Sequence, residues 1–220
     1  MLVARLGPYC SYCERKISAG LEVEHLQPTG LPQYSHLIGT WTNFLLACRN
    51  CNATKSKKDV SFLDLIFPDR DNTFAPFTYA PDGKVMPHVG LVPQTRDQAN
   101  ATLSLTGLDK RINNTLDENG KLVALDRVAQ RMEAWSVATM SRDDAQGDQD
   151  NEPLRRQIAR TARESRFFSI WMTVFAGDVD MLNRLINAFE GTRQSGCFDA
   201  TGDSVTPGPN PDQLPYGSKS

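Results

Sequence analysis

The sequence predicts an α+β protein, in which a small metal-braced unit of two strands and one helix precedes a mainly helical region. Four of the five cysteines form two Cys-x-x-Cys pairs within the first quarter of the chain. Short segments of alternating apolar and polar residues lie between these pairs, and amphipathic helical patterns fill the second half. The length of 220 residues is sufficient for a sizeable hydrophobic core.

We expect the chain to divide into four parts. Residues 1–66 hold the paired cysteines and form a finger, and residues 67–110 form a connection of loops and hairpins. Residues 111–200 form the helical region. Residues 201–220 are rich in proline and glycine, and we expect them to be a disordered tail.

The expected elements of the finger follow from its local patterns. Residues 21–26 alternate apolar and polar side chains and predict a strand, and residues 43–48 predict a second one. A helix is expected to begin at Asn52 and run to about Lys58. The many prolines of residues 67–100, with turn signals such as Pro81-Asp82-Gly83, predict loops and short hairpins.

Helices are predicted for most of the second half. Apolar residues recur at three- and four-residue steps over residues 121–140. Residues 141–152 are strongly acidic and almost free of apolar side chains, which predicts an exposed loop. A longer helix is expected to open at Glu152-Pro153 and run to about Ala176, and another to span residues 179–189.

The charge balance narrows the possible functions. The formal net charge is −2 and the pI about 5.9, which argues against a protein that coats nucleic acid by bulk electrostatics. Residues 1–70 hold eight Lys and Arg against six Asp and Glu, so a small local phosphate site remains possible. We found no stretch long and apolar enough for a membrane span and no signal-peptide core, and we expect a cytoplasmic protein.

The two Cys-x-x-Cys pairs predict a structural zinc site. Cys10, Cys13, Cys48 and Cys51 can supply four thiolates to one tetrahedral zinc ion. The alternatives are disulfides or unrelated buried thiols, and the absence of an export signal favours zinc. Cys197 stands alone and is expected to be an ordinary thiol.

The segment between and after the pairs holds the residue types that a metal-dependent phosphodiesterase needs. These are a base to deprotonate water, oxygen ligands for a hard cation, and cations for phosphate. Each residue alone has a plainer interpretation, such as a structural histidine or an Asn helix cap. The candidates are Glu24, His25, Asn43, Asn52, Lys55, Lys57 and Lys58.

Together these residues form a recognisable pattern: Cys-x-x-Cys, then Glu-His with Pro three residues after the His, then Asn-x-x-x-x-Cys-x-x-Cys-Asn-x-x-Lys. The pattern resembles the zinc-bearing HNH endonucleases over residues 10–58. The letters of that name correspond to His25, Asn43 and Asn52. The resemblance implies a ββα-metal finger, in which two strands and a helix hold one catalytic cation and the zinc braces the fold.

The resemblance also implies a role for each residue. His25 would be the general base, and Asn43 would fix the following loop and orient His25. Asn52 would bind a catalytic Mg²⁺ or Mn²⁺ together with Glu24, where the family more often has Asp. Lys55, Lys57 and Lys58 would contact substrate phosphate. Two further histidines are expected to be surface residues: His36, whose place between His25 and Asn43 leaves a site role open, and His88.

Outer motifs resemble the HNH proteins of bacterial anti-phage systems of the Septu type and their retron-associated relatives. They are Pro68-Asp-Arg-Asp-Asn-Thr73, Phe77-x-Tyr79, Thr106-Gly-Leu-Asp109 and Gly191-Thr-Arg-x-x-x-Cys-Phe-Asp199. This resemblance implies a nuclease that cuts DNA and is controlled by an ABC- or SMC-like ATPase. Two alternatives remain open: a nuclease that cuts RNA or tRNA with the same finger, and a zinc-stabilised nucleic-acid-binding or interaction module without catalysis.

Overall fold

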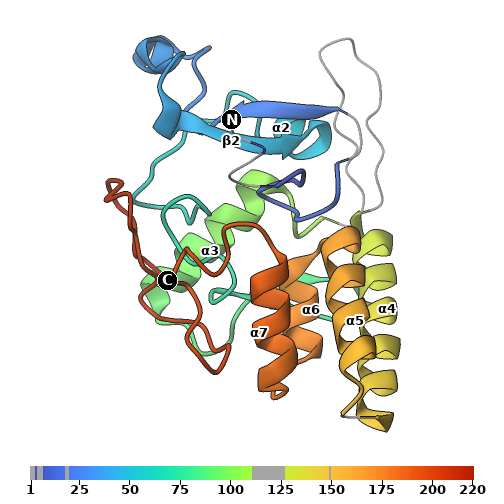
Figure 1. Ribbon diagram of the computed structural model, residues 1–220. Coiled ribbons are helices and arrows are strands. Elements are labelled where there is room, and N and C mark those ends of the chain that lie inside the picture. The colour runs from blue at the N-terminus through green and yellow to red at the C-terminus, as the bar shows by residue number, and fades with distance from the viewer. Residues whose placement is uncertain (1–2, 4–6, 18–19, 111–126, 149) are drawn as a thin grey trace.

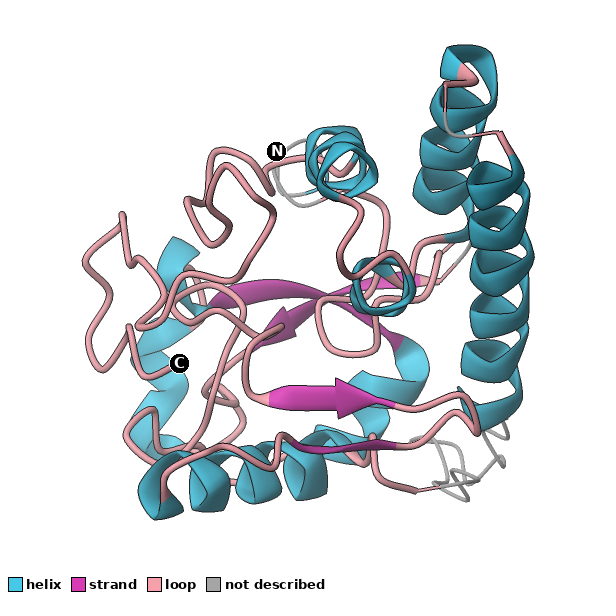
Figure 2. Ribbon diagram, turned by 90° about the horizontal axis from the view of Figure 1, so that it is seen from below, coloured by secondary structure: helices cyan, strands magenta, loops and turns pink. Residues whose placement is uncertain are grey.

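The computed structural model describes residues 3, 7–17, 20–110, 127–148 and 150–220. In Figure 1 the finger lies at the top and the helices α4 to α7 stand side by side below it. Figure 2 shows the strands near the centre of the view and a side built largely from loops around the C-terminus. The α+β architecture predicted from the sequence, a cysteine-bearing finger followed by a mainly helical region, is confirmed.

The finger is a ββα unit. Strand β1 (Leu21–His25) pairs antiparallel with β2 (Phe44–Cys48), in a register that sets Leu21 opposite Cys48 and His25 opposite Phe44. Two short 3₁₀ helices, η1 (Pro32–Leu37) and η2 (Trp41–Asn43), connect the strands. Helix α2 (Arg49–Lys55) follows β2 directly because Cys48 is its N-cap: the Cys48 Sγ accepts a hydrogen bond from the Cys51 N–H.

The connection contains a hairpin, as predicted, and a helix that was not predicted. Strands β3 (Phe77–Tyr79) and β4 (Val85–Pro87) pair antiparallel around a turn at Gly83. Helix α3 (Pro93–Thr106) occupies a segment expected to be loop. Pro93 stands at its first turn, where a proline costs no hydrogen bond, and Gly107 ends it in the left-handed conformation at φ 62°.

The helical region consists of α4 (Arg127–Gly147), α5 (Glu152–Ser165), α6 (Phe168–Val174) and α7 (Val179–Ala188). The part of the predicted 121–140 helix that precedes residue 127 lies outside the described residues. The acidic segment expected to be a loop from residue 141 is instead helical to Gly147. Ala145 is buried there, so packing against the neighbouring helices extends α4 through an acidic stretch.

A second difference is the break in the helix predicted to run from residue 152 to about 176. Arg166 and Phe167 both have positive φ values, 65° and 57°, which end α5. Contacts with the finger stabilise this break. The Phe167 N–H donates to the Glu14 carbonyl at 3.1 Å, and the Glu14 carboxylate accepts hydrogen bonds from the Ser169 N–H at 2.8 Å and its hydroxyl at 2.5 Å.

Residues 201–220 also differ from expectation, because they follow a defined path with specific contacts instead of forming a disordered tail. The Ser218 N–H donates to the Arg70 carbonyl at 2.9 Å, and the Lys219 ammonium lies 2.9 Å from the fully buried Asp71 carboxylate. The segment therefore packs against residues 70–72 of the connection. None of the described helices is both long and apolar enough to cross a membrane.

Candidate zinc centre and active site

The four paired cysteines gather at one buried point of the finger. Cys10 and Cys13 lie before β1, Cys48 ends β2 and Cys51 lies in α2. Their sulfur atoms all lie within 4.8 Å of one another, and the Cys13 and Cys48 sulfurs are 3.9 Å apart. Four Zn–S bonds of about 2.3 Å in a tetrahedron separate the sulfurs by about 3.8 Å, whereas a disulfide needs about 2.05 Å. The cluster therefore fits a structural zinc ion and no disulfide.

Two buried arginines of α4 lie next to this cluster. The Arg127 guanidinium is 3.4 Å from the Cys51 sulfur and also donates to the carbonyls of Thr106 and Gly107. Arg131 donates to the carbonyls of Gly83 and Leu108. A zinc ion with four thiolates carries a net negative charge, and a buried charge is costly without a counter-charge. The arginines supply this counter-charge, and Arg127 also joins α4 to the finger at Cys51.

His25 lies at the end of β1, partly exposed, with a fixed ring orientation. Its Nε2 is 3.3 Å from the Ile38 carbonyl, and its ring meets that of Phe44 edge-on at 5.1 Å. Because a carbonyl only accepts hydrogen bonds, Nε2 carries the proton of the neutral ring in this contact. The Nδ1 atom is then the unprotonated nitrogen, which is the form a general base requires.

Asn43 holds the chain that follows His25. Its side-chain oxygen accepts from the Gln27 N–H at 2.8 Å, and its amide nitrogen donates to the Gln27 carbonyl at 3.0 Å. The Asn43 carbonyl also accepts from the Leu26 N–H at 2.9 Å. The two-sided bond is of the kind expected from a residue that fixes this loop. An effect on catalysis stays a prediction.

Lys55 has a different environment from the one expected of a phosphate ligand. Its ammonium lies 2.6 Å from the Glu24 carboxylate and donates to the His25 carbonyl at 2.9 Å, and both charged side chains are almost fully buried. Burial raises the pKa of Glu24, and Lys55 opposes that rise. Because α2 places this ammonium inside the finger, its position does not fit contact with substrate phosphate. The exposed Lys57 and Lys58 remain the candidates.

Asn52 faces β1, where it meets a residue that the sequence analysis missed. Its amide nitrogen donates to the Glu22 carboxylate at 2.8 Å. Glu22 and Glu24 are two residues apart on β1 and share the side toward α2, while the ring of His25, at the end of the strand, contacts that of Phe44. The alternation of residues 21–25 was the signal that could have identified Glu22.

The oxygen donors at this position suit a hard cation. The Glu22 carboxylate and the Asn52 amide are already neighbours, whereas Glu24 is held by Lys55. Among the described residues, the cysteines are the one group of three or more His, Cys, Asp or Glu side chains close enough to hold a metal. A second cation would thus use the Asn52 amide as well as carboxylate oxygens.

The remaining candidates lie elsewhere. His36 is exposed in η1, in the segment between β1 and β2 that also contains Ile38. His88 is exposed, and its Nδ1 accepts from the Gly90 N–H at 3.2 Å within a turn. Cys197 is partly buried, which raises the pKa of its thiol.

Residues 10–58 match the family model for HNH endonuclease. The matched segment contains the four cysteines, both strands of the finger and α2. A comparison with curated proteins gave no match. The matched family is one of nucleases, and the match coincides with the part of the structure in which His25 and the cysteine cluster lie.

Proposed function

We propose that this protein is a metal-dependent endonuclease that hydrolyses phosphodiester bonds of DNA. The observation that carries the proposal is the position of His25 at a partly exposed strand end, with Nε2 3.3 Å from the Ile38 carbonyl. In the neutral ring, a hydrogen bond to this carbonyl uses Nε2–H and offers Nδ1 as the base. The family match of the same segment supports hydrolysis by a nuclease.

The residues of the finger have separate roles in the proposed hydrolysis. His25 Nδ1 removes a proton from a water molecule that attacks the phosphorus, while Asn43 holds the following loop at Gln27. Glu22 and Asn52 would hold one Mg²⁺ or Mn²⁺, which would supply positive charge next to the phosphate. The expected products carry 5′-phosphate and 3′-hydroxyl ends, as the HNH resemblance implies.

Cleavage of plasmid DNA and of total RNA in Mg²⁺ or Mn²⁺ tests this proposal. His25→Ala is expected to lower the rate roughly 10²- to 10⁴-fold, the usual share of a general base, while zinc content and melting temperature stay unchanged. His88→Ala, which alters an exposed turn histidine, is the matched control and is expected to cut like the unaltered protein.

Three outcomes would contradict the proposal. A His25→Ala protein that cuts at the original rate would exclude His25 as the base. Cleavage of RNA alone would replace the DNA endonuclease with a ribonuclease. A folded, zinc-loaded protein that binds nucleic acid but cuts neither substrate would favour an interaction module.

We further propose that an ABC- or SMC-like ATPase delivers this nuclease to DNA during defence against phage. The low charge of residues 1–70 supports this, since a weak electrostatic hold on a duplex calls for delivery by another protein. The outer motifs resemble proteins of such systems. Purification of the protein with the products of its neighbouring genes is expected to yield a complex with an ATPase. A protein that acts alone and fully in cells would contradict this part.

A further inference from the structure

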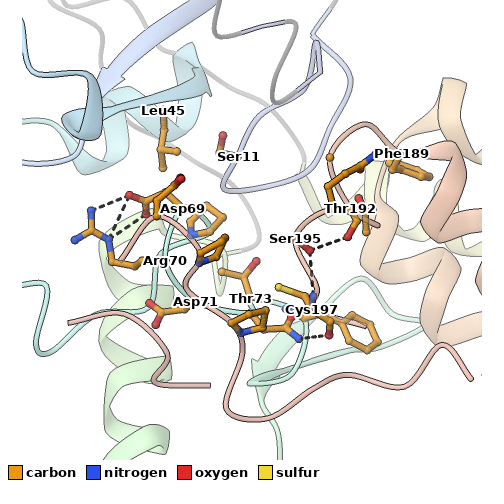
Figure 3. Close-up of a pocket in the computed structure, with 18 of the residues that line it drawn as sticks. Ser11, Leu45, Asp69, Arg70, Asp71, Thr73, Phe189, Thr192, Ser195 and Cys197 are labelled. Carbon is orange, nitrogen blue, oxygen red and sulfur yellow. Dashed lines mark hydrogen bonds and ion pairs between the residues drawn. The ribbon is translucent and has the colours of Figure 1, made fainter. Parts of the chain in front are cut away.

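A pocket of about 370 Å³ lies where the finger, the connection, the helical region and residues 209–214 meet. Figure 3 shows Ser11 and Leu45 of the finger on one side, Asp69, Arg70 and Asp71 of the connection on another, and Thr192, Ser195 and Cys197 on a third, with Thr73 next to Cys197. Two segments singled out in the sequence, residues 68–73 and 191–199, thus line one cavity, where the Asn72 amide nitrogen donates to the Cys197 carbonyl at 3.0 Å. The proposed chemistry of His25 uses none of these residues.

The pocket is lined by aromatic side chains from opposite parts of the chain. Trp41 and Phe44 belong to the finger, whereas Phe74, Phe168 and Phe189 belong to the connection and the helical region. Flat aromatic faces bind planar rings by stacking, and the volume lies in the range of sites for small organic molecules. The shape of the lining favours a planar aromatic ligand.

The polar lining favours a ligand that donates hydrogen bonds. Asp69 faces the pocket, and although it accepts from Arg70, a carboxylate has capacity for further donors. The hydroxyls of Ser11 and Thr73 have no hydrogen-bond partner among the described residues. Acidic residues outnumber Arg70 in the lining, which disfavours a phosphate inside the pocket. Ring N–H and amino groups of a nucleobase match these acceptors.

The pocket reaches the β1–β2 ribbon next to the proposed general base. Phe44 lines the pocket and is the register partner of His25, whose ring it contacts. Trp41 also lines the pocket and packs edge-on against Phe44, with ring centroids 6.4 Å apart. A nucleic-acid strand that presents a phosphate to His25 therefore has this cavity beside it.

We propose that the pocket binds one unstacked nucleobase of the substrate strand, next to the phosphodiester that is cut. This inference rests on the proposed nuclease function. Taking a base out of a duplex costs free energy, and the cost is smallest where the base is already unpaired. The pocket therefore gives the enzyme a preference for single-stranded or mispaired DNA at the cleavage site.

Binding measurements with the catalytically inactive His25→Ala full-length protein in EDTA test the pocket without cleavage. The probes are a short single-stranded oligonucleotide with one 2-aminopurine base, the same strand with an abasic site at that position, and the four free nucleosides. We expect the 2-aminopurine emission to fall on binding, because the base stacks on aromatic rings. The abasic strand is expected to bind roughly 5- to 150-fold more weakly, the loss of one stacked base.

A variant that fills the pocket completes the test. Thr192→Trp, at the pocket wall, is expected to weaken binding of the intact strand as strongly as the abasic site does. Thr161→Trp, at a partly buried position of α5 outside the pocket lining, is the matched control and is expected to bind normally.

Equal affinity for intact and abasic strands, with no effect of Thr192→Trp, would overturn the inference. If free nucleosides bind in the pocket as tightly as the strand, the pocket recognises a nucleobase, but its ligand is a free nucleotide and the proposal of a base of the substrate strand is wrong. These binding measurements need no cleavage. If the pocket binds a base but the unaltered protein cuts no nucleic acid, the proposed function is refuted while the inference about the pocket stands.

Discussion

Lys55 and Glu24 show how strongly one buried contact changes the interpretation of a residue. Both side chains are almost fully buried and 2.6 Å apart, so each neutralises the other inside the finger. Removal of one partner from a buried pair leaves an unpaired charge in a poorly solvated site. Lys55 therefore stabilises the finger through its buried ion pair with Glu24.

We predict that Lys55→Met lowers the free energy of unfolding by about 3–5 kcal/mol, the usual cost of breaking a buried ion pair. Urea unfolding of the zinc-loaded protein measures it. Lys57→Met, at an exposed position two residues later, is expected to change stability little. If Lys55→Met unfolds like the unaltered protein and instead weakens substrate binding, Lys55 contacts phosphate after all.

Glu22 and Asn52 are the residues from which we expect an effect on the catalytic cation. Both are partly exposed and 2.8 Å apart, so altering either one removes an oxygen donor with little effect on the core. Glu22→Gln and Asn52→Ala are each predicted to raise the Mn²⁺ concentration for half-maximal cleavage by roughly tenfold or more. Glu133→Gln on the exposed side of α4 is the control, and an unchanged Mn²⁺ requirement in both variants would exclude this site.

At the scale of the elements, α4 and the zinc centre stabilise each other. Arg127 reaches the Cys51 sulfur from α4, and hydrogen bonds to ligand atoms typically change metal affinity 10- to 100-fold. Arg127→Met is predicted to speed the release of zinc to a colorimetric chelator by a factor in that range. Arg142→Met, on the same helix but paired with the exposed Asp143, should release zinc at the original rate. Equal rates for both variants would show that Arg127 does not support the metal.

Helices α5 and α7 are joined by charges whose contribution depends on pH. Arg184 bonds Glu152 and Asp180, and its hydrogen bonds are the main cause that lowers the pKa of both carboxyls. Carboxyls of the unfolded chain titrate near pH 4. The pKa values of these carboxyls are lower in the folded protein than in the unfolded chain. The ion pairs therefore stabilise the fold above about pH 4, and this stabilisation is lost as the pH falls through the folded pKa values.

Arg184→Gln is accordingly predicted to melt at a lower temperature than the unaltered protein at pH 7. The difference should shrink as the pH falls below about 4, where the carboxyls become protonated. Melting temperatures recorded from pH 7 to pH 3 measure the effect. A difference that stays constant over this range would show that these ion pairs do not stabilise the contact between the two helices.

At the scale of the whole molecule, residues 201–220 connect distant parts of the chain through Asp71. The fully buried Asp71 carboxylate accepts from the N–H groups of Phe67 and Lys219 and pairs with the Lys219 ammonium. A buried donor left without its partner costs about 1–3 kcal/mol. Asp71→Ala is predicted to make residues 201–220 sensitive to limited proteolysis, mapped by mass spectrometry, whereas the exposed Asp64→Ala leaves them protected. Equal protection would contradict this contact.

The sequence alone determined the features that depend on spacing within a short segment. In each Cys-x-x-Cys turn the two sulfurs come from residues only three positions apart, so local chain geometry brings them together, and the alternation at residues 21–26 predicts β1. These local rules were sufficient to predict the cysteine cluster, both strands of the finger and His25 at a strand end. The match of residues 10–58 to the HNH endonuclease family agrees with that prediction.

Tertiary structure decided what depends on partners far away in the chain. Helix α5 ends at Ser165 because Glu14, about 150 residues earlier in the chain, binds the start of α6. Lys55 is buried because α2 packs against Glu24. The proline-rich C-terminal segment is held in place because the Asp71 carboxylate accepts a hydrogen bond from the Lys219 N–H. Periodicity and composition report only the preferences of neighbouring residues, whereas these contacts form only when the whole chain has folded, so no local pattern could have predicted them.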